Sequence, residues 1–317
     1  MTDVRIGRRA FLQGAAGLAA LGASGIVSSS AGQAQVEVPN STGTEPPTIK
    51  VPALTCDCHQ HIYDAVRFPP VAPPVEPNSR VEEYRLLQKR IGTTRNIVVT
   101  PGPYATNNAV TLDAIKTFGA NARGVAVIQP TITDDELQAL HKGGIRGIRF
   151  ANPAPGRVTT IEMIEPLSKR VNELGWHVDF NMNGDEIVAN EALFNRLPSQ
   201  IIFDHMGHLP QPAGANHPAF TVIRKLIDKG RTWVKLSVTA NNPPATYDQI
   251  DMIATAYLKA APERMVWGSN WPHPSETKKP DDAVLIDLVA RWTLSEPTRH
   301  KLFVENAEVL YGFPKFS

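Results

Sequence analysis

The sequence predicts an α/β protein of the (β/α)₈ TIM-barrel class, and three observations favour this fold. Short runs rich in β-branched residues alternate eight times with amphipathic stretches of helical period, which is typical of βα units around a parallel sheet. Of the 317 residues, 283 follow the first 34, close to the ~250 residues of one barrel. Polar residues gather where the expected strands end, the face that carries the active site of such barrels. A doubly wound open sheet would give a similar alternation.

The expected strands lie at residues 54–61, 96–100, 124–128, 144–150, 177–182, 201–205, 233–238 and 265–269. The expected helices lie at residues 81–90, 110–118, 134–141, 160–174, 185–195, 219–229, 247–260 and 282–292. Thr133 and Glu136 have the spacing of a capping box at the start of the third helix. An extra C-terminal helix is expected at residues 296–311, packed on the barrel.

Residues 1–34 have the features of a twin-arginine signal peptide. Arg8 and Arg9 are followed by Phe11-Leu12, by an Ala- and Gly-rich apolar stretch, and by small residues up to Ala34. The apolar stretch is too short and too weakly apolar to act as a stop-transfer helix. We therefore expect handling by the twin-arginine (Tat) translocon and a periplasmic or exported protein. Residues 35–50, rich in Pro, Thr and Ser, are expected to form a flexible linker, and residues 51–317 the barrel.

The composition argues against several classes of partner. A net charge of +1 gives no support for binding nucleic acid or a membrane surface. No later stretch is apolar and long enough to span a bilayer, so we expect no membrane contact in the mature form. The two cysteines, Cys56 and Cys58, are poorly placed to bridge each other and are expected in the barrel wall.

The ends of the expected strands carry the candidate site. Asp57, His59 and His61 alternate at period two along the first strand, so we expect them to face the interior, with the cysteines outward. The other candidates at strand ends are Arg149, Asn181, Asp204, His205, Lys235, Ser237, Asn270 and His273.

Three of these motifs together resemble the amidohydrolase superfamily. They are Asp57-X-His59-X-His61, then Asp204-His205-Met206-Gly207, and finally Gly268-Ser269-Asn270-Trp271-Pro272-His273. The resemblance is closest to the amidohydrolase-2 branch, which includes 2-pyrone-4,6-dicarboxylate lactonase and D-galactarolactone isomerase. It implies hydrolysis, or a related acyl shift, at a carbonyl group polarised in the mouth of the barrel.

The sequence departs from the metal-dependent members at two positions. Those members use a first-strand histidine pair, histidines on the fifth and sixth strands, and an eighth-strand Asp. This chain has Asn181 at the fifth-strand position and Asn270 at the eighth. An amide cannot accept a proton near neutral pH, so the usual general base is missing as well. We expect no required cofactor, with one Zn²⁺ held by His59, His61 and His205 as the alternative.

The lactonase resemblance implies a role for each remaining candidate. The three histidines would polarise the substrate carbonyl, and Arg149 would anchor a substrate carboxylate through its forked guanidinium. Lys235 would bind substrate or pair with Asp204 or Asp179. Further candidates for substrate contact are His273, which could instead orient the catalytic candidate Asn270, and Asn181.

We therefore predict a hydrolase that acts on a lactone or cyclic ester of a small carboxylated substrate, such as a sugar acid or dicarboxylate. Two enzyme alternatives stay open: a lactone isomerase that works by an intramolecular acyl shift, and a zinc-dependent amidohydrolase or decarboxylase. A third alternative is an exported protein that only binds a small ligand.

Overall fold

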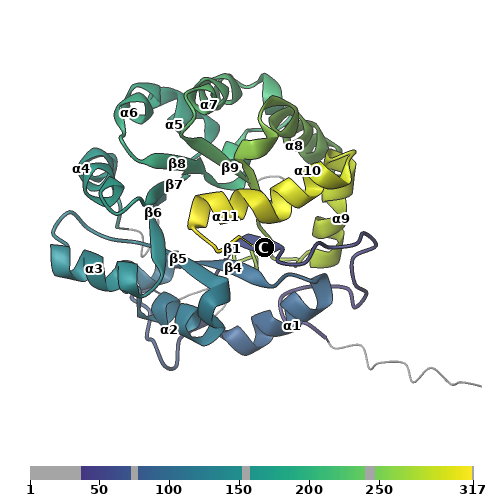
Figure 1. Cartoon of the computed structure of the whole chain (residues 1–317), viewed down its shortest axis with the longest axis horizontal. Helices are drawn as coiled ribbons and strands as arrows, with labels where there is room; N and C mark the ends of the chain where they lie inside the picture. Colours follow the sequence, from purple (N-terminus) through teal and green to yellow (C-terminus); the bar gives the residue numbers. More distant parts are fainter. Residues whose placement is uncertain (1–36, 73–77, 152–157, 240–246, 316–317) are drawn as a thin grey trace, which may run out of the picture. The chain divides into compact units, whose positions relative to one another are not determined.

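Eight parallel strands form the central sheet of the computed structural model, which describes residues 37–72, 78–151, 158–239 and 247–315. They neighbour one another in chain order (Figure 1): β1 (Cys56–Gln60), β4 (Arg95–Val99), β5 (Ala122–Ala126), β6 (Ile145–Ala151), β7 (His177–Asn181), β8 (Gln200–Phe203), β9 (Thr232–Leu236) and β10 (Met265–Trp267). The last strand meets the first. Asn270 N donates to His59 O at 2.8 Å, and His61 N donates to Trp271 O at 2.9 Å. The sheet thus closes into the predicted barrel, and each predicted strand overlaps an observed one.

The strands approach each other closely at this junction. A β-carbon on Gly268 would lie 2.7 Å from His59 Cβ and 2.9 Å from His59 N. Only glycine therefore allows the end of β10 to lie this close to the histidine of β1.

Helices cover the outside of the barrel between successive strands (Figure 1). They are α1 (Val81–Ile91), α2 (Ala109–Phe118), α3 (Asp134–Lys142), α4 (Ile161–Asn172), α5 (Gly184–Ala189), α6 (Glu191–Arg196), α7 (Pro218–Asp228), α8 (Asp248–Ala260) and α9 (Asp282–Trp292). The eight predicted helices are confirmed, except that the fifth is divided at Asn190 into α5 and α6. Thr133 caps α3 as predicted, because its side chain accepts a hydrogen bond from Glu136 N at 3.2 Å.

A few short elements were not expected from the sequence. A two-stranded antiparallel sheet, β2 (Tyr63–Asp64) and β3 (Asn78–Ser79), precedes α1. Single 3₁₀ turns lie at Gly102–Tyr104, Gly119–Asn121, Gly214–Asn216 and Pro262–Arg264. Among the helices that the structure describes, none has both the length and the apolar character needed to cross a membrane.

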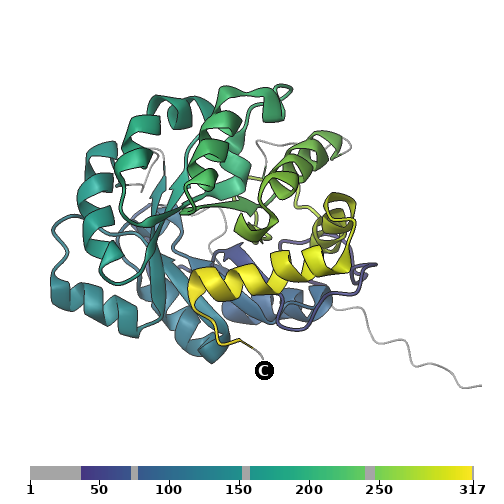
Figure 2. The same cartoon turned by 45° about the horizontal axis from the view of Figure 1, so that its top comes forward.

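The predicted C-terminal helix closes one end of the barrel (Figures 1 and 2). It comprises α10 (Glu296–His300), a π-helical turn at Lys301–Glu305 and α11 (Asn306–Tyr311). The Tyr311 ring lies 5.2 Å from the ring of His177, the first residue of β7. The helix therefore covers the amino-terminal ends of the strands, so the opposite, carboxyl-terminal end holds the candidate site.

The first strand does not follow the expected alternation. Its register against β4 shifts between Asp57 and Gln60, which marks an irregularity of the bulge type. Cys56 and Cys58 belong to a cluster of buried residues from α11 and from strands on both sides of β1 and across the barrel from it, an arrangement that only the interior allows. The other members include Ile97, Val125, Ile202, Trp233, Val266, Ala307, Leu310 and Tyr311. Both cysteines thus face inward.

Asp57, in contrast, faces the helix layer. It accepts a hydrogen bond of 2.9 Å from Tyr84 Oη of α1 and one of 2.6 Å from Ser269 Oγ. The prediction that Asp57 faces inward and the cysteines outward is therefore wrong. The physical reason is the irregular residue in β1, which changes the facing of the strand and still brings His59 and His61 to the interior.

The described part of the expected linker, residues 37–50, is held against the barrel. Val38 is 2% exposed, and Trp271 Nε1 donates to Pro39 O at 2.9 Å. The carboxylate of Asp287 accepts hydrogen bonds from Thr48 N and Ile49 N at 2.9 and 3.1 Å. This segment is therefore docked rather than a free tether, because side chains of the barrel satisfy its backbone groups. The proposed signal peptide, residues 1–34, lies outside the described residues.

Candidate active site

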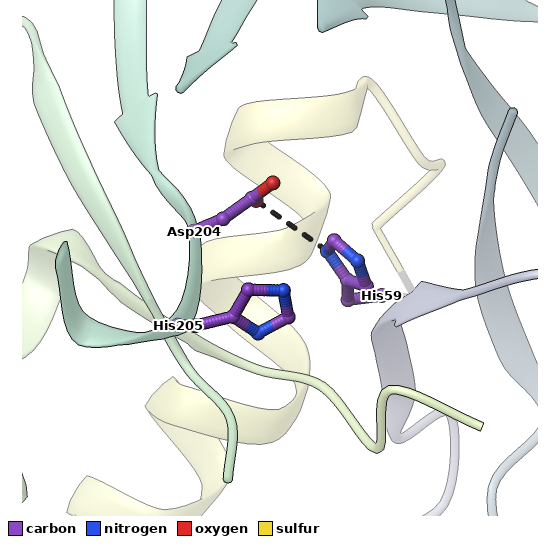
Figure 3. Close-up of side chains that lie close together, drawn as sticks. All are labelled: His59, Asp204 and His205. Carbon is purple, nitrogen blue, oxygen red and sulfur yellow. Dashed lines mark ion pairs between the residues drawn. The ribbon is translucent and has the colours of Figure 1, made fainter. Parts of the chain in front are cut away.

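Three buried imidazoles meet at the carboxyl-terminal end of the barrel (Figure 3 shows two of them). His59 comes from β1, His61 follows that strand, and His205 follows β8. The ring centroid of His59 lies 4.9 Å from that of His61 and 4.6 Å from that of His205. The three side chains are at most 4% exposed. The structure therefore brings together the three histidines that the sequence singled out.

An unusual turn presents His205. After β8, the backbone is left-handed at four residues in a row, with φ of 50° at His205, 56° at Met206, 72° at Gly207 and 43° at His208. The left-handed form costs roughly 1–2 kcal/mol for each non-glycine residue. The turn is held by burial of Met206, which is 0% exposed, and by a hydrogen bond from Tyr257 Oη to Met206 O. Such strain persists only where the surrounding structure determines it, and it is common at functional sites.

A buried ion cluster lies beside the imidazoles. Lys235 Nζ is 2.5 Å from Asp179 Oδ2 and 3.1 Å from Asp204 Oδ1. Arg149 Nε donates to Asp204 Oδ2 at 2.8 Å. Two carboxylates thus neutralise two cations, all at most 7% exposed. Lys235 is fully buried between its partners, so the structure favours the ion-paired alternative for this residue over direct contact with substrate.

The charges in this cluster are mutually stabilised. Burial alone would raise the pKa of Asp204, but Lys235, His59 and Arg149 hold that pKa well below its ordinary value. Burial likewise opposes the charge on Lys235, but Asp179 and Asp204 raise its pKa above the ordinary value. Asp204 and Lys235 are therefore an ionised pair at neutral pH.

The imidazoles, in contrast, are held neutral. Burial lowers the pKa of His59 to about 3, and it lowers the pKa of His61 and of His205 well below the ordinary histidine value. A neutral imidazole offers one N–H donor and one lone-pair acceptor. The site therefore contains three neutral groups that can donate or accept a hydrogen bond without adding charge.

Arg149 faces a small cavity at the same end of the barrel. This cavity, of about 20 Å³, is lined by Arg149 together with Thr100, Val127 and Thr159. Its Nε is taken by Asp204, and among the described residues no partner is bonded to its terminal N–H groups, which can therefore bind a ligand. The geometry is compatible with the predicted role of Arg149 in anchoring a carboxylate.

The two eighth-strand candidates are linked to each other. Asn270 has a φ of 68°, and its backbone N–H donates to His59 O as part of the barrel closure. His273 N donates to Asn270 O at 2.8 Å, while His273 Nε2 lies 3.2 Å from both carboxylate oxygens of Asp282. His273 is 0% exposed, and this placement favours its alternative role, the positioning of Asn270.

Two further polar residues support the site: Ser237, a strand-end candidate with no predicted role, and His208, which was not predicted. Ser237 Oγ lies 2.7 Å from His205 Nδ1, and Asn181 Oδ1 lies 2.6 Å from His208 Nε2. Ser237 is among the predicted strand-end candidates because it lies two positions after Lys235 and shares its strand face. The position of His208 depends on the left-handed turn, which no periodicity in the sequence indicates. Asn181, predicted to contact substrate, is thus paired with His208.

The donor set fits a resident divalent cation poorly. His59, Asp204 and His205 offer ligand atoms within 4.8 Å of one another. However, both oxygens of Asp204 already face cations, Lys235 Nζ at 3.1 Å and Arg149 Nε at 2.8 Å. Lys235 Nζ also lies 3.3 Å from His59 Nδ1. A metal ion at this place would share its only carboxylate with two permanent positive charges, which would repel it.

Comparison with known proteins identifies relatives of this arrangement. A family model described as amidohydrolase matches residues 56–313. The chain is 31% identical to a 4-sulfomuconolactone hydrolase of Rhizobium radiobacter, over 84% of this chain and 93% of that protein. It is 31% identical to a 2-pyrone-4,6-dicarboxylate hydrolase of Comamonas testosteroni, over 84% of this chain and 92% of that protein. It is 30% identical to a D-galactarolactone isomerase of Agrobacterium fabrum, over 73% of this chain and 80% of that protein.

A solved structure extends the similarity to three dimensions. An apo crystal structure from Agrobacterium tumefaciens superposes with a TM-score of 0.78 at 27% sequence identity, covering 85% of this chain and all of that one. The similarity thus includes nearly the whole barrel.

Proposed function

The chain belongs to the amidohydrolase family, and we propose that it is an enzyme that hydrolyses a lactone ring in a small carboxylated substrate. The observation that carries this proposal is the group of three neutral imidazoles beside the buried guanidinium of Arg149. The relatives named for lactone hydrolysis support the same class of substrate.

The residues divide the work by their chemistry. The terminal N–H groups of Arg149 bind a substrate carboxylate in a bidentate manner and so orient the ring. Imidazole N–H groups donate to the lactone carbonyl, where negative charge develops as the attacking oxygen adds. Burial excludes water from around these donors and so strengthens their effect on the transition state.

A lactone isomerase is the second candidate, and Asn270 is the observation that favours it. An intramolecular acyl shift needs polarisation of the carbonyl and positioning of a substrate hydroxyl, but no activated water. An asparagine at this place can hold a hydroxyl although it cannot take its proton. The relative named as a D-galactarolactone isomerase fits this candidate.

We also propose that catalysis requires no metal ion. Support comes from Asp204, which is already neutralised by Lys235 and Arg149, and from the amides at positions 181 and 270. One Zn²⁺ held by the three histidines is the alternative that an experiment must address.

For residues 1–34 we propose the role of a twin-arginine signal, so that the enzyme would act in the periplasm or beyond. The support is the order of Arg8-Arg9, the apolar stretch and the small residues up to Ala34. Microscopy of a fusion in which Arg8 and Arg9 are both changed to Lys would test this role, because twin-arginine export should then stop.

A panel of carboxylated lactones, assayed with the protein from residue 35 onward, tests the proposed function. Ring opening should appear for at least one lactone, should survive treatment with a chelator, and should fall at least 100-fold in His205→Ala, which loses an oxyanion donor. Stoichiometric zinc that is needed for turnover would overturn the metal-free proposal. A His205→Ala variant with the wild-type rate would show that the site is elsewhere.

A further inference from the structure

The site leaves one chemical need unmet, the acceptor of the proton from the attacking hydroxyl. Asn270 cannot serve, and the carboxylates of Asp179 and Asp204 are engaged by Lys235 and Arg149. Asp57 faces Tyr84 of α1 instead of the barrel interior. Among the described side chains of the site, the imidazoles are the remaining groups with a nitrogen lone pair, so their tautomers decide which of them can accept a proton.

The tautomer of His61 follows from its backbone partner. Its Nδ1 lies 2.8 Å from the carbonyl oxygen of Val99, the last residue of β4. A carbonyl oxygen can only accept, so Nδ1 carries the hydrogen. Because His61 is neutral, its Nε2 then has a lone pair and is an acceptor.

The tautomer of His59 follows from Lys235. The ammonium group lies 3.3 Å from His59 Nδ1, and an ammonium group can only donate. Nδ1 is therefore the acceptor, and Nε2 carries the hydrogen. Asp204 Oδ1 also lies 3.4 Å from Nδ1, but this is the longer of the two contacts and the same oxygen faces Lys235 Nζ at 3.1 Å, so the ammonium group sets the tautomer.

The Nε2 of His59 is the donor that a substrate carbonyl can use. It is buried and has no hydrogen-bond partner within the described parts of the chain. Leaving such a donor unsatisfied costs free energy, and a substrate carbonyl in contact with it would remove that cost. The neighbouring rings of His59 and His61 lie edge to face with centroids 4.9 Å apart, so one small substrate can reach both.

We propose that His59 and His61 are held as opposite tautomers, with His59 as the donor to the carbonyl and His61 as the acceptor of the proton, and that Lys235 is the positioning residue for His59. The inference rests on the proposed opening of a lactone. The attacking O–H gives its proton to His61 Nε2 as the new C–O bond forms, and the carbonyl oxygen, now negative, accepts a hydrogen bond from His59 Nε2. The ring C–O bond then breaks, and His61 returns the proton to the leaving oxygen.

Nitrogen-15 NMR of histidine-labelled protein tests the tautomers directly, because the two ring nitrogens have different shifts when protonated or bare. Single variants His59→Gln and His61→Gln assign the two signals among the nine histidines of the chain. The proposal expects hydrogen on Nε2 of His59 and on Nδ1 of His61. Hydrogen on Nδ1 of His59, or on Nε2 of His61, would overturn it.

Two variants of Lys235 test whether this residue sets the tautomer of His59. In Lys235→Met the donor is gone, so His59 should turn to the Nδ1–H form facing Asp204. Lys235→Arg keeps a donor and should keep Nε2–H. An unchanged His59 spectrum in Lys235→Met would contradict the role of Lys235. If the Met variant does not fold, loss of the Nε2–H form in Lys235→Arg would be the contradicting result.

Kinetics then separate this inference from the proposed function. His61→Gln should lower kcat by about 10²–10⁴-fold with little change in KM, since glutamine cannot accept a proton. A kcat within threefold of wild type would remove His61 from the reaction. If no lactone is turned over at all, the proposed function fails, whereas the NMR result still decides the tautomers.

Discussion

Asn270 is the residue on which the choice between hydrolysis and isomerisation depends. Its φ of 68° lies in the left-handed region, which asparagine, aspartate and glycine tolerate best. An aspartate therefore fits the same backbone and would add a carboxylate that can take a proton from water.

We expect Asn270→Asp to increase lactone hydrolysis about 10-fold or more, the lower end of what a positioned base contributes. Steady-state rates on the active lactone measure this. Asn270→Gly is the matched control, because it keeps the backbone conformation without a functional side chain. Equal hydrolysis by the Asp and Gly variants would show that position 270 does not activate water.

The turn after β8 is the element that sets the geometry of the site, and Gly207 is its most constrained position. A β-carbon there would lie 2.7 Å from Ile223 Cδ1, at a φ of 72°. We expect Gly207→Ala to lower the free energy of unfolding by about 2–4 kcal/mol, from overpacking and left-handed strain together.

Urea unfolding measures this loss, and Gly175→Ala is its control. Gly175 has a similar φ of 69° but no atom within 4 Å of an added β-carbon. Gly175→Ala should lower the free energy of unfolding by about 1–2 kcal/mol, from left-handed strain alone. Equal losses in the two variants would show that the turn is not tightly packed against α7.

The elements of the barrel were predictable because alternation and capping are local signals. The helix at Asp282–Trp292 has its predicted bounds, and Thr133 caps α3 as its sequence indicates. The sequence could not predict which side chains of β1 face the interior. One irregular residue reverses the alternation of the strand, and this irregularity arises where β1 pairs with β4. The left-handed turn at His205 was also hidden, since tertiary packing imposes it against the preference of each residue.

At the scale of the whole molecule, buried histidines make stability depend on pH. Burial lowers the pKa of His59 and of His177 to about 3, and lowers those of His61 and His205 well below 6.5. At a pH between the lowered pKa of each buried histidine and the ordinary value of 6.5, the unfolded chain binds protons that the folded chain does not. Stability is therefore complete above about pH 6.5 and falls as the pH drops, by up to about 1.4 kcal/mol per pH unit for each histidine.

Asp57 acts in the opposite direction. Burial raises its pKa from 3.8 to about 6, so its own contribution is present at low pH and is lost as the pH rises toward 6. Burial likewise raises the pKa of Asp179 to about 7, although Lys235 opposes this shift. Four histidines outweigh these two carboxyl groups, so we expect a net loss of stability from about pH 6.5 to about pH 5.

Chemical denaturation at a series of pH values across this range measures how steeply the free energy of unfolding changes with pH. A flat profile in the wild type would contradict the burial of neutral imidazoles.

The helix that closes the amino-terminal end of the barrel also makes the two cysteines reporters of folding. Cys56 and Cys58 are the only thiols of the chain, and both are buried beneath Leu310 and Tyr311. Burial raises the pKa of Cys56 well above its ordinary value, which keeps this thiol protonated and unreactive while the helix is docked. Both thiols would become exposed if this helix left the end of the barrel, so their reactivity reports whether the helix is docked.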